Sequence, residues 1–173
     1  MHLKQGYVQI YTGEGKGKTT AAVGLALRAA GAGLRVAMLH FLKNKYSAED
    51  RLLKKIANVR VWKFGASGWV KGRGRAQDLA EAGRGLRVLK NILCCGEFDC
   101  VIADEACVAA SLGLISEQAL LACLEARPAK VELVLTGRGA TRALKQQADL
   151  VTDMKAEKHY FNQGTAARRG IEF

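Results

Sequence analysis

The side chains best suited to chemistry lie in a glycine-rich segment near the start of the chain, Gly13-Glu14-Gly15-Lys16-Gly17-Lys18-Thr19-Thr20. Glycines allow backbone N–H groups to turn toward phosphate oxygens, because no Cβ stands in the way. In a Gly-Lys-Thr sequence between a strand and a helix, the lysine reaches the terminal phosphates and the threonine hydroxyl holds Mg²⁺. The segment therefore predicts a bound nucleoside triphosphate with Mg²⁺ or Mn²⁺, and catalytic roles for Lys18 and Thr19.

The segment differs from the usual phosphate-binding pattern at its first position. In G-x-x-x-x-G-K-T the first glycine would stand at position 12, where this chain has Thr12, and glycines follow at 13 and 15. The Glu14 carboxylate would repel phosphates, so we expect it to point outward or toward the sugar or base. Lys16 adds positive charge. The alternative is a glycine-rich turn that binds nothing, which the strand before Gly-Lys-Thr and the helical pattern after it disfavour.

A pair of carboxylates follows a second apolar strand. Asp104 and Glu105 come directly after residues 100–103, which is the Walker B arrangement. One of them can complete the shell of Mg²⁺, directly or through water, because Mg²⁺ prefers oxygen ligands and keeps several waters. The alternative is an acid pair at a helix N-terminus, stabilised by the helix dipole. Given the upstream loop, we predict that Thr19, Asp104 and Glu105 form the metal site.

Two arginines are further candidates for contact with the nucleotide. Arg138 follows the apolar residues 131–135, and Arg28 lies ten residues beyond Lys18 on the expected first helix. In open parallel sheets, ligands bind beyond the carboxyl ends of the strands, which is where Arg138 is expected. For each arginine the alternative is a solvated surface position.

Short apolar runs alternate with amphipathic segments along the whole chain. We expect strands at residues 7–11, 35–41, 59–64, 100–104, 131–136 and 150–154. Helices are expected at residues 19–32, 47–57, 75–94, 116–127 and 141–147. Continuous apolar strands fit a parallel sheet that is covered on both faces. The prediction is an α/β fold with a doubly wound, mostly parallel sheet of about six strands and a RecA-like core, in one domain spanning residues 1–173.

The chain is strongly basic, with 27 lysines and arginines against 16 acidic residues and a formal net charge of +11. Such a charge suggests an anionic partner. Nucleic acid is one meaning, and a triphosphate with a second anionic ligand is another. The positive residues are spread along the chain rather than gathered in a tail, so a solvated basic surface is the alternative and nucleic acid is not favoured.

The composition also bears on compartment and metal content. No run of 18 or more apolar residues is present, so we expect no membrane span, and the start of the chain has no apolar signal core. The five cysteines include no C-x-x-C pair, and we expect reduced thiols and no zinc site. The predicted location is the cytoplasm.

One long connection and one histidine stand near the predicted site. Residues 64–75 are rich in glycine and carry Trp69 with several positive side chains. Long loops are often binding loops. The alternative is a plain solvent loop whose Trp69 tucks into the protein core. His40 ends the second expected strand, and we expect a hydrogen-bonded structural role for it.

Several of these segments together resemble one family. Residues 13–22, Asp104-Glu105, residues 135–139, residues 148–154 and the ending from Lys158-His159 to Gly170-Ile171-Glu172 resemble the P-loop class of ATP:corrinoid adenosyltransferases over nearly the whole chain. The resemblance implies that cobalt(I) of a reduced corrinoid attacks the 5′ carbon of ATP, takes the adenosyl group and releases inorganic triphosphate. It also implies that Thr19 and Glu105 bind Mg²⁺. The residues expected to contact ATP are Gly13, Glu14, Gly15, Lys16, Gly17, Lys18, Thr19, Thr20, Arg28 and Arg138.

The resemblance further implies an aromatic pair, in the loop after the third strand, that packs on the corrinoid and displaces its lower axial ligand. Trp69 fits the first aromatic, whereas Lys71 stands where the second is expected. Phe64 or Phe41 could compensate, so we expect Phe41, Phe64 and Trp69 to contact the corrinoid. His40 stands where the family carries glutamine.

The resemblance implies ATP and a reduced corrinoid as substrates, and a protein that donates electrons to the cobalt. A homodimer is left open. Two alternatives belong to other classes. A RecA-like nucleic-acid-dependent ATPase is allowed by the fold and the charge, and a small-molecule kinase would transfer the terminal phosphate.

Overall fold

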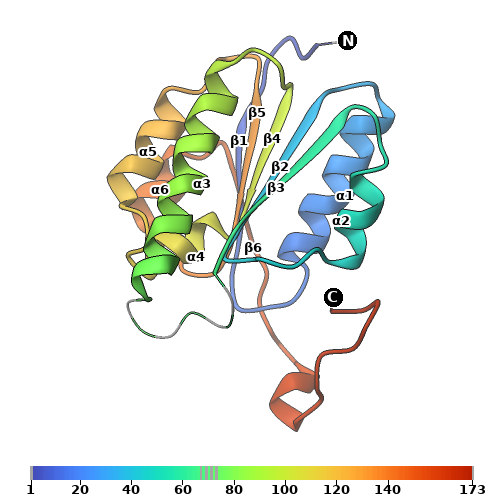
Figure 1. Cartoon of the computed structure of the whole chain (residues 1–173), viewed down its shortest axis with the longest axis vertical. Coiled ribbons are helices and arrows are strands. Elements are labelled where there is room, and N and C mark those ends of the chain that lie inside the picture. The colour runs from blue at the N-terminus through green and yellow to red at the C-terminus, as the bar shows by residue number, and fades with distance from the viewer. Residues whose placement is uncertain (1, 67, 69, 71, 73, 173) are drawn as a thin grey trace.

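The structure, a computed structural model, describes residues 2–66, 68, 70, 72 and 74–172. A six-stranded sheet runs through its centre in the order β3-β2-β4-β5-β1-β6, and all neighbouring strands are parallel (Figure 1). The strands are β1 (Val8–Thr12), β2 (Val36–Phe41), β3 (Val59–Phe64), β4 (Cys100–Asp104), β5 (Glu132–Thr136) and β6 (Leu150–Asp153). The predicted six-stranded parallel sheet is therefore confirmed.

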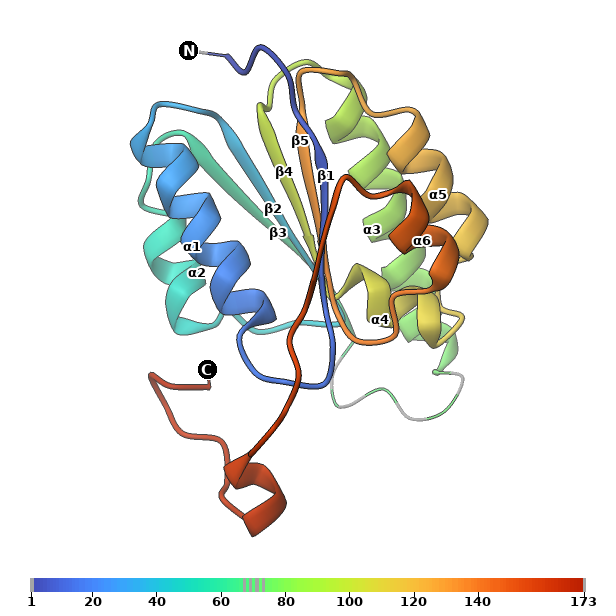
Figure 2. The same ribbon diagram turned by 180° about the vertical axis from the view of Figure 1, so that it is seen from behind.

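Helices cover both faces of the sheet. They are α1 (Lys18–Gly31), α2 (Ala48–Leu53), α3 (Ala76–Cys94), α4 (Ala106–Ser111), α5 (Glu117–Glu125) and α6 (Arg142–Gln147), with a 3-10 helix, η1 (Tyr160–Gln163). In both views α1 and α2 lie on one face, and α3 to α6 lie on the other (Figures 1 and 2). This is the doubly wound arrangement. None of the helices in the described residues is long and apolar enough to cross a membrane.

Alternate residues of each buried strand supply the two cores on either side of the sheet. In β2, Val36 and Met38 face the core under α1, while Ala37, Leu39 and Phe41 face the core on the opposite side. Successive side chains of a strand point to opposite faces, so a strand covered on both sides must be apolar at every position. All six residues of β2 are buried for this reason, although one of them is a histidine.

The sheet ends at β6 in an exposed edge, and the chain then leaves the body of the fold. All four residues of β6 are exposed. Residues beyond β6 extend past the carboxyl ends of the strands and carry η1, as Figure 2 shows. The last part of the chain therefore lies at the same end of the sheet as the glycine-rich loop.

Candidate nucleotide-binding site

The glycine-rich loop joins β1 to α1 and lies against the segment that follows β6. Gly13 and Gly17 have φ values of +98° and +119°, a region that glycine adopts without strain. A Cβ on Gly13 or Gly15 would lie 2.5 or 2.6 Å from the backbone oxygen of Met154. The Gly15 N–H also donates to this oxygen at 2.6 Å. Position 12 is still a buried residue of β1, so no glycine is needed there. The backbone of Met154 leaves no room for a side chain at Gly13 or Gly15, which explains why the glycines stand at these two positions.

The Lys18 side chain curls back into the loop. Its Nζ donates to the carbonyl oxygens of Gly13 at 2.7 Å and Gly15 at 2.6 Å. Burial and the nearby Arg138 charge lower the pKa of Lys18. An ammonium that is partly dehydrated and close to another cation is well placed to exchange its carbonyl partners for phosphate oxygens.

Thr19, which follows Lys18, joins the glycine-rich loop to β4. The Oγ1 of Thr19 donates to Oδ1 of Asp104 at 2.7 Å. The structure thus brings together the hydroxyl and the first carboxylate of the predicted metal site.

Asp104 is fully buried and accepts four hydrogen bonds. Oδ1 accepts from Thr19 and from Thr136, both at 2.7 Å. Oδ2 accepts from His40 Nδ1 at 2.8 Å and from Lys43 Nζ at 2.7 Å. Burial alone would raise the pKa of Asp104, but the His40 hydrogen bond and the Lys43 charge hold it well below its usual range. Both oxygens are thus engaged, which favours an indirect role in metal binding.

Glu105 presents a carboxylate of a different kind. Its backbone is left-handed, with φ +61°, an uncommon conformation for a residue with a side chain. Its N–H donates to Thr136 Oγ1 at 2.9 Å. Within the described part of the chain its carboxylate makes no hydrogen bond or ion pair, and burial and the Asp104 charge raise its pKa. A carboxylate that burial and the neighbouring Asp104 disfavour as an anion fits the approach of a divalent cation.

His40 continues the polar network away from the loop. Its Nε2 forms an ion pair with Asp50 Oδ1 at 2.7 Å, and Asp50 Oδ2 pairs with Lys63 Nζ at 2.7 Å. His40 and Asp50 are fully buried. Burial lowers the pKa of His40, but the contacts with Asp104 and Asp50 outweigh burial and raise it. The expected structural histidine therefore bridges two buried carboxylates.

Sequence reasoning did not single out Lys43 or Thr136. Both lie at the carboxyl ends of strands, Thr136 as the last residue of β5 and Lys43 two residues after β2. That position is the signal that could have identified them, since β2 and β5 flank β4 on its two sides.

Lys16 ties the loop to the end of the chain. Its Nζ donates to Tyr160 Oη at 2.9 Å, to the Ile171 carbonyl at 3.1 Å and to Glu172 Oε1 at 2.8 Å. The Glu172 and Tyr160 hydrogen bonds raise the pKa of Lys16. Arg168 pairs with the same glutamate at 3.2 Å. The Lys16 ammonium is thus occupied by the C-terminal segment in this structure.

The remaining loop residues lie at the rim of the site. Glu14 points outward, as expected, and pairs with Arg138, whose Nη1 lies 3.3 Å from its Oε2. Thr20 is exposed at the start of α1. A pocket of about 380 Å³ adjoins the loop and is lined by Thr12, Gly13, Glu14, Gly139, Ala140, Lys145, Asp153, Lys155 and Ala156. The pocket is large enough for part of a small ligand and shares Gly13 and Glu14 with the loop.

Arg28 lies one helix length from the glycine-rich loop. It lies exposed in the last turn of α1, whereas Lys18 begins that helix. Ten residues of helix span about 15 Å, so the expected contact between Arg28 and the nucleotide held by the same chain is not supported.

Two of the aromatic residues expected to contact the corrinoid are buried. Phe41 and Phe64 have 0% and 1% of their surface exposed, because their rings pack on α3 at Gly85, where a Cβ would lie 2.8 Å from one ring and 2.9 Å from the other. Neither ring is open to a ligand in this structure. Trp69 and Lys71 lie outside the described residues.

The chain is similar to known proteins in sequence and in fold. A family model described as "ATP:corrinoid adenosyltransferase BtuR/CobO/CobP" matches residues 4–173. The corrinoid adenosyltransferase of Pseudomonas aeruginosa is 31% identical over 172 residues, which cover 98% of this chain and 85% of that protein. Corrinoid adenosyltransferase CobA of Salmonella typhimurium is 30% identical over 170 residues, covering 98% of this chain and 87% of that protein.

One solved structure with a similar fold is a KaiC-like protein of Pyrococcus horikoshii. Its TM-score is 0.55 with 16% identity, over 89% of this chain and 74% of that one. The likeness shows the fold that the two chains share.

Proposed function

Because this chain belongs to the ATP:corrinoid adenosyltransferase family, we propose that its glycine-rich loop holds ATP by the triphosphate while the adenosyl group departs. The reaction transfers the 5′-deoxyadenosyl group of ATP to cobalt(I) of a reduced corrinoid. The cobalt electron pair forms the bond to the 5′ carbon, the carbon–oxygen bond to the α-phosphate breaks, and inorganic triphosphate leaves. The match over residues 4–173 carries this choice of reaction.

The loop residues act on the leaving group. We propose that the N–H groups of residues 13–19 and the Lys18 ammonium bind the triphosphate. Fixed donors aimed at developing charge stabilise the transition state without reorganisation. The loop geometry supports this role, because Lys18 Nζ already lies within hydrogen-bonding distance of the Gly13 and Gly15 carbonyls. No proton is transferred, so no general base is required of the chain.

We propose that Thr19 and Glu105 hold Mg²⁺ or Mn²⁺. Their hydroxyl and carboxylate oxygens suit a hard cation that takes few protein ligands, and Glu105 lacks any other partner in the described residues. When bound, the ion neutralises charge on the phosphates. Asp104 positions Thr19 through their 2.7 Å hydrogen bond, and it would contact the ion only through water.

We propose that the loop after β3, residues 65–75, faces the corrinoid. Holding the corrinoid near the 5′ carbon supplies the orientation that a bimolecular reaction otherwise lacks. A partner protein that delivers electrons to the cobalt, a homodimer and a cytoplasmic location belong to the same proposal. The single sheet with a core on each face supports one domain for the whole chain.

The direct test is product formation. Purified chain, ATP and a chemically reduced corrinoid should yield a light-sensitive adenosylcorrinoid, and omission of ATP should yield none. ATP hydrolysis stimulated by single-stranded nucleic acid, without any cobalt–carbon bond, would support the RecA-like ATPase instead and contradict the proposal.

A further inference from the structure

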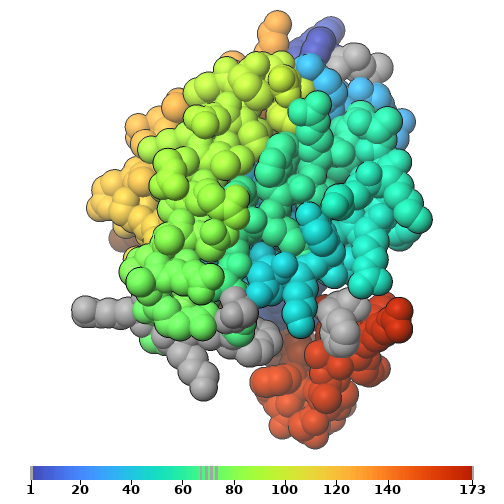
Figure 3. All heavy atoms as spheres, viewed as in Figure 1, coloured from blue at the N-terminus to red at the C-terminus, as the bar shows by residue number. Residues whose placement is uncertain are grey.

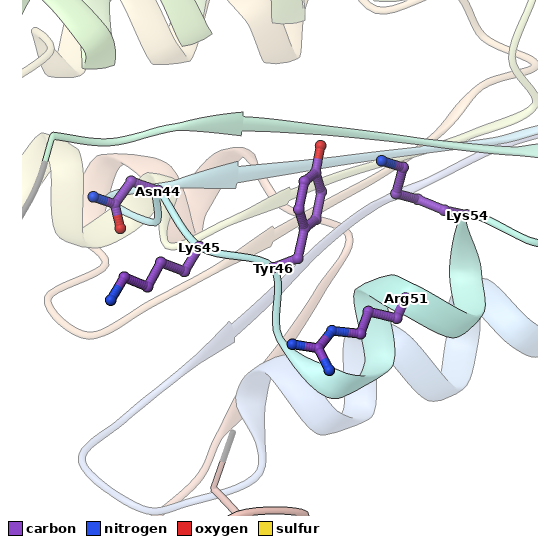
Figure 4. A pocket seen from close by; sticks show the side chains of 5 residues that line it. All are labelled: Asn44, Lys45, Tyr46, Arg51 and Lys54. Carbon is purple, nitrogen blue, oxygen red and sulfur yellow. The ribbon is translucent and has the colours of Figure 1, made fainter.

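A positively charged groove lies between the end of β2 and helix α2. Its volume is about 600 Å³, and it is lined by Asn44, Lys45, Tyr46, Arg51 and Lys54. All five residues are exposed. Figure 4 shows that they come from the loop 44–46 and from one side of α2 and its C-terminal end, with the Tyr46 ring standing between the loop and Lys54.

The groove gathers three cationic side chains. Lys45, Arg51 and Lys54 form no ion pair within the described part of the chain. Lys54 Nζ lies 4.2 Å from the centre of the Tyr46 ring, and Lys63 Nζ lies 4.3 Å from the same ring centre. Clustered cations raise the local potential and attract an anion. The groove therefore has the chemistry of an anion site.

The triphosphate does not account for this charge. The phosphate loop follows β1, and β4 and β5 separate β1 from β2 in the sheet. In Figure 3 the segment 44–54, coloured light blue to teal, lies on the face between α3 and the C-terminal segment. The groove is therefore a second cluster of cationic side chains at the same end of the sheet.

The groove borders the start of the loop after β3, which we propose faces the corrinoid. A Cβ on Gly65 would lie 2.6 Å from the backbone nitrogen of Lys43, so the start of the loop after β3 packs directly on the loop after β2. A corrinoid held over the loop after β3 can extend a peripheral side chain to the loop after β2.

We propose that the groove binds an anionic peripheral group of the corrinoid, either a side-chain carboxylate or the phosphodiester of a nucleotide loop. This assignment rests on the proposed function and names the part of the substrate that the groove recognises. A corrinoid whose side chains are all neutral amides gains no binding from the groove. The groove thereby selects among corrinoids by the charge of their periphery.

The test compares three chemically reduced corrinoids. Cobalamin carries a phosphodiester, cobyrinic acid a,c-diamide carries carboxylates, and cobinamide carries neither. The variant is Lys45→Ala with Arg51→Ala, and the matched control is Lys55→Ala with Lys90→Ala, which removes two exposed charges outside the groove. KM for each corrinoid and for ATP is measured with each protein.

The groove variant should raise KM about five- to tenfold for at least one anionic corrinoid, as the loss of two exposed charge pairs predicts. KM for cobinamide and for ATP should stay constant, and the control should match the wild type. The anionic corrinoid whose KM rises identifies the group bound. In the wild type, added salt should raise the same KM, because salt screens exposed charges.

Three results would overturn the assignment. One is an equal change for all three corrinoids, and another is no change for any. The third is a defect that appears only when a protein delivers the electrons, since the groove would then dock an acidic electron donor. A wild-type chain that adenosylates none of the corrinoids would instead contradict the proposed function itself, and the assignment with it.

Discussion

The hydroxyl of Thr19 donates a 2.7 Å hydrogen bond to Asp104, a residue 85 positions further along the chain. The contact links the phosphate loop to the end of β4 and fixes the threonine oxygen before any ion arrives. The glycine-rich loop and the Asp104-Glu105 pair, which lie far apart in the sequence, therefore form one site.

The first prediction concerns the Thr19 hydroxyl. Thr19→Ala should lower kcat/KM at least about 100-fold, as is typical when one group that stabilises transition-state charge is removed. The free energy of unfolding should fall by only about 1 kcal/mol, the net worth of one hydrogen bond. Adenosylation rates and urea unfolding measure the two effects. Thr19→Ser keeps the hydroxyl and should keep most of the activity; an inactive serine variant would argue against a role for that oxygen.

The second prediction separates the two neighbouring carboxylates. Asp104→Asn leaves Lys43 without its counter-charge and leaves His40 paired with Asp50 alone, so the free energy of unfolding should fall by about 3–5 kcal/mol. Glu105→Gln removes a carboxylate without partners in the described residues, so the fold should be unaffected while the Mg²⁺ concentration for half-maximal rate rises. Thermal unfolding and magnesium titrations distinguish the two variants. Equal loss of stability in both would contradict the assigned roles.

The third prediction follows from the raised pKa of His40. A histidine whose pKa is higher in the folded state stabilises the fold fully below its unfolded-state pKa, about 6.5, and loses this contribution as pH rises through the folded-state pKa. The free energy of unfolding of the wild type, relative to His40→Gln, should therefore be larger at pH 6 than at pH 9.5. Urea titrations without added Mg²⁺ measure the difference. A constant difference would show that His40 is not charged.

The fourth prediction tests the shifted glycines. Gly13→Ala forces a side chain into a left-handed backbone with φ +98° and toward the Met154 carbonyl. It should cost about 1–3 kcal/mol of stability and weaken ATP binding. Gly24→Ala in α1 is the matched control, because nothing lies within 4 Å of its added Cβ, and it should stabilise the helix slightly. Calorimetry with ATP measures both; similar losses in the two variants would contradict the packing explanation.

The sequence pattern sufficed for the parallel sheet, the phosphate loop and the Asp104-Glu105 pair, because each depends on local residue types. The donors to Asp104 were harder to foresee. His40, Lys43 and Thr136 come from two other strand ends, and their convergence depends on the strand order β2-β4-β5, which residue patterns do not specify.

The geometry lends no support to two of the expected ligand contacts, for different physical reasons. The rise of a helix already places Arg28 one helix length from Lys18. Phe41 and Phe64 could not be excluded from local sequence, because the space that buries them is opened by Gly85 on a helix further along the chain.

The proposed reaction releases triphosphate intact while the 5′ carbon of ATP reacts. Its most direct test is phosphorus NMR of a reaction mixture containing the chain, ATP, Mg²⁺ and a chemically reduced corrinoid. We predict inorganic triphosphate in equal amount to the adenosylcorrinoid formed. ADP and inorganic phosphate, released without a cobalt–carbon bond, would contradict the account.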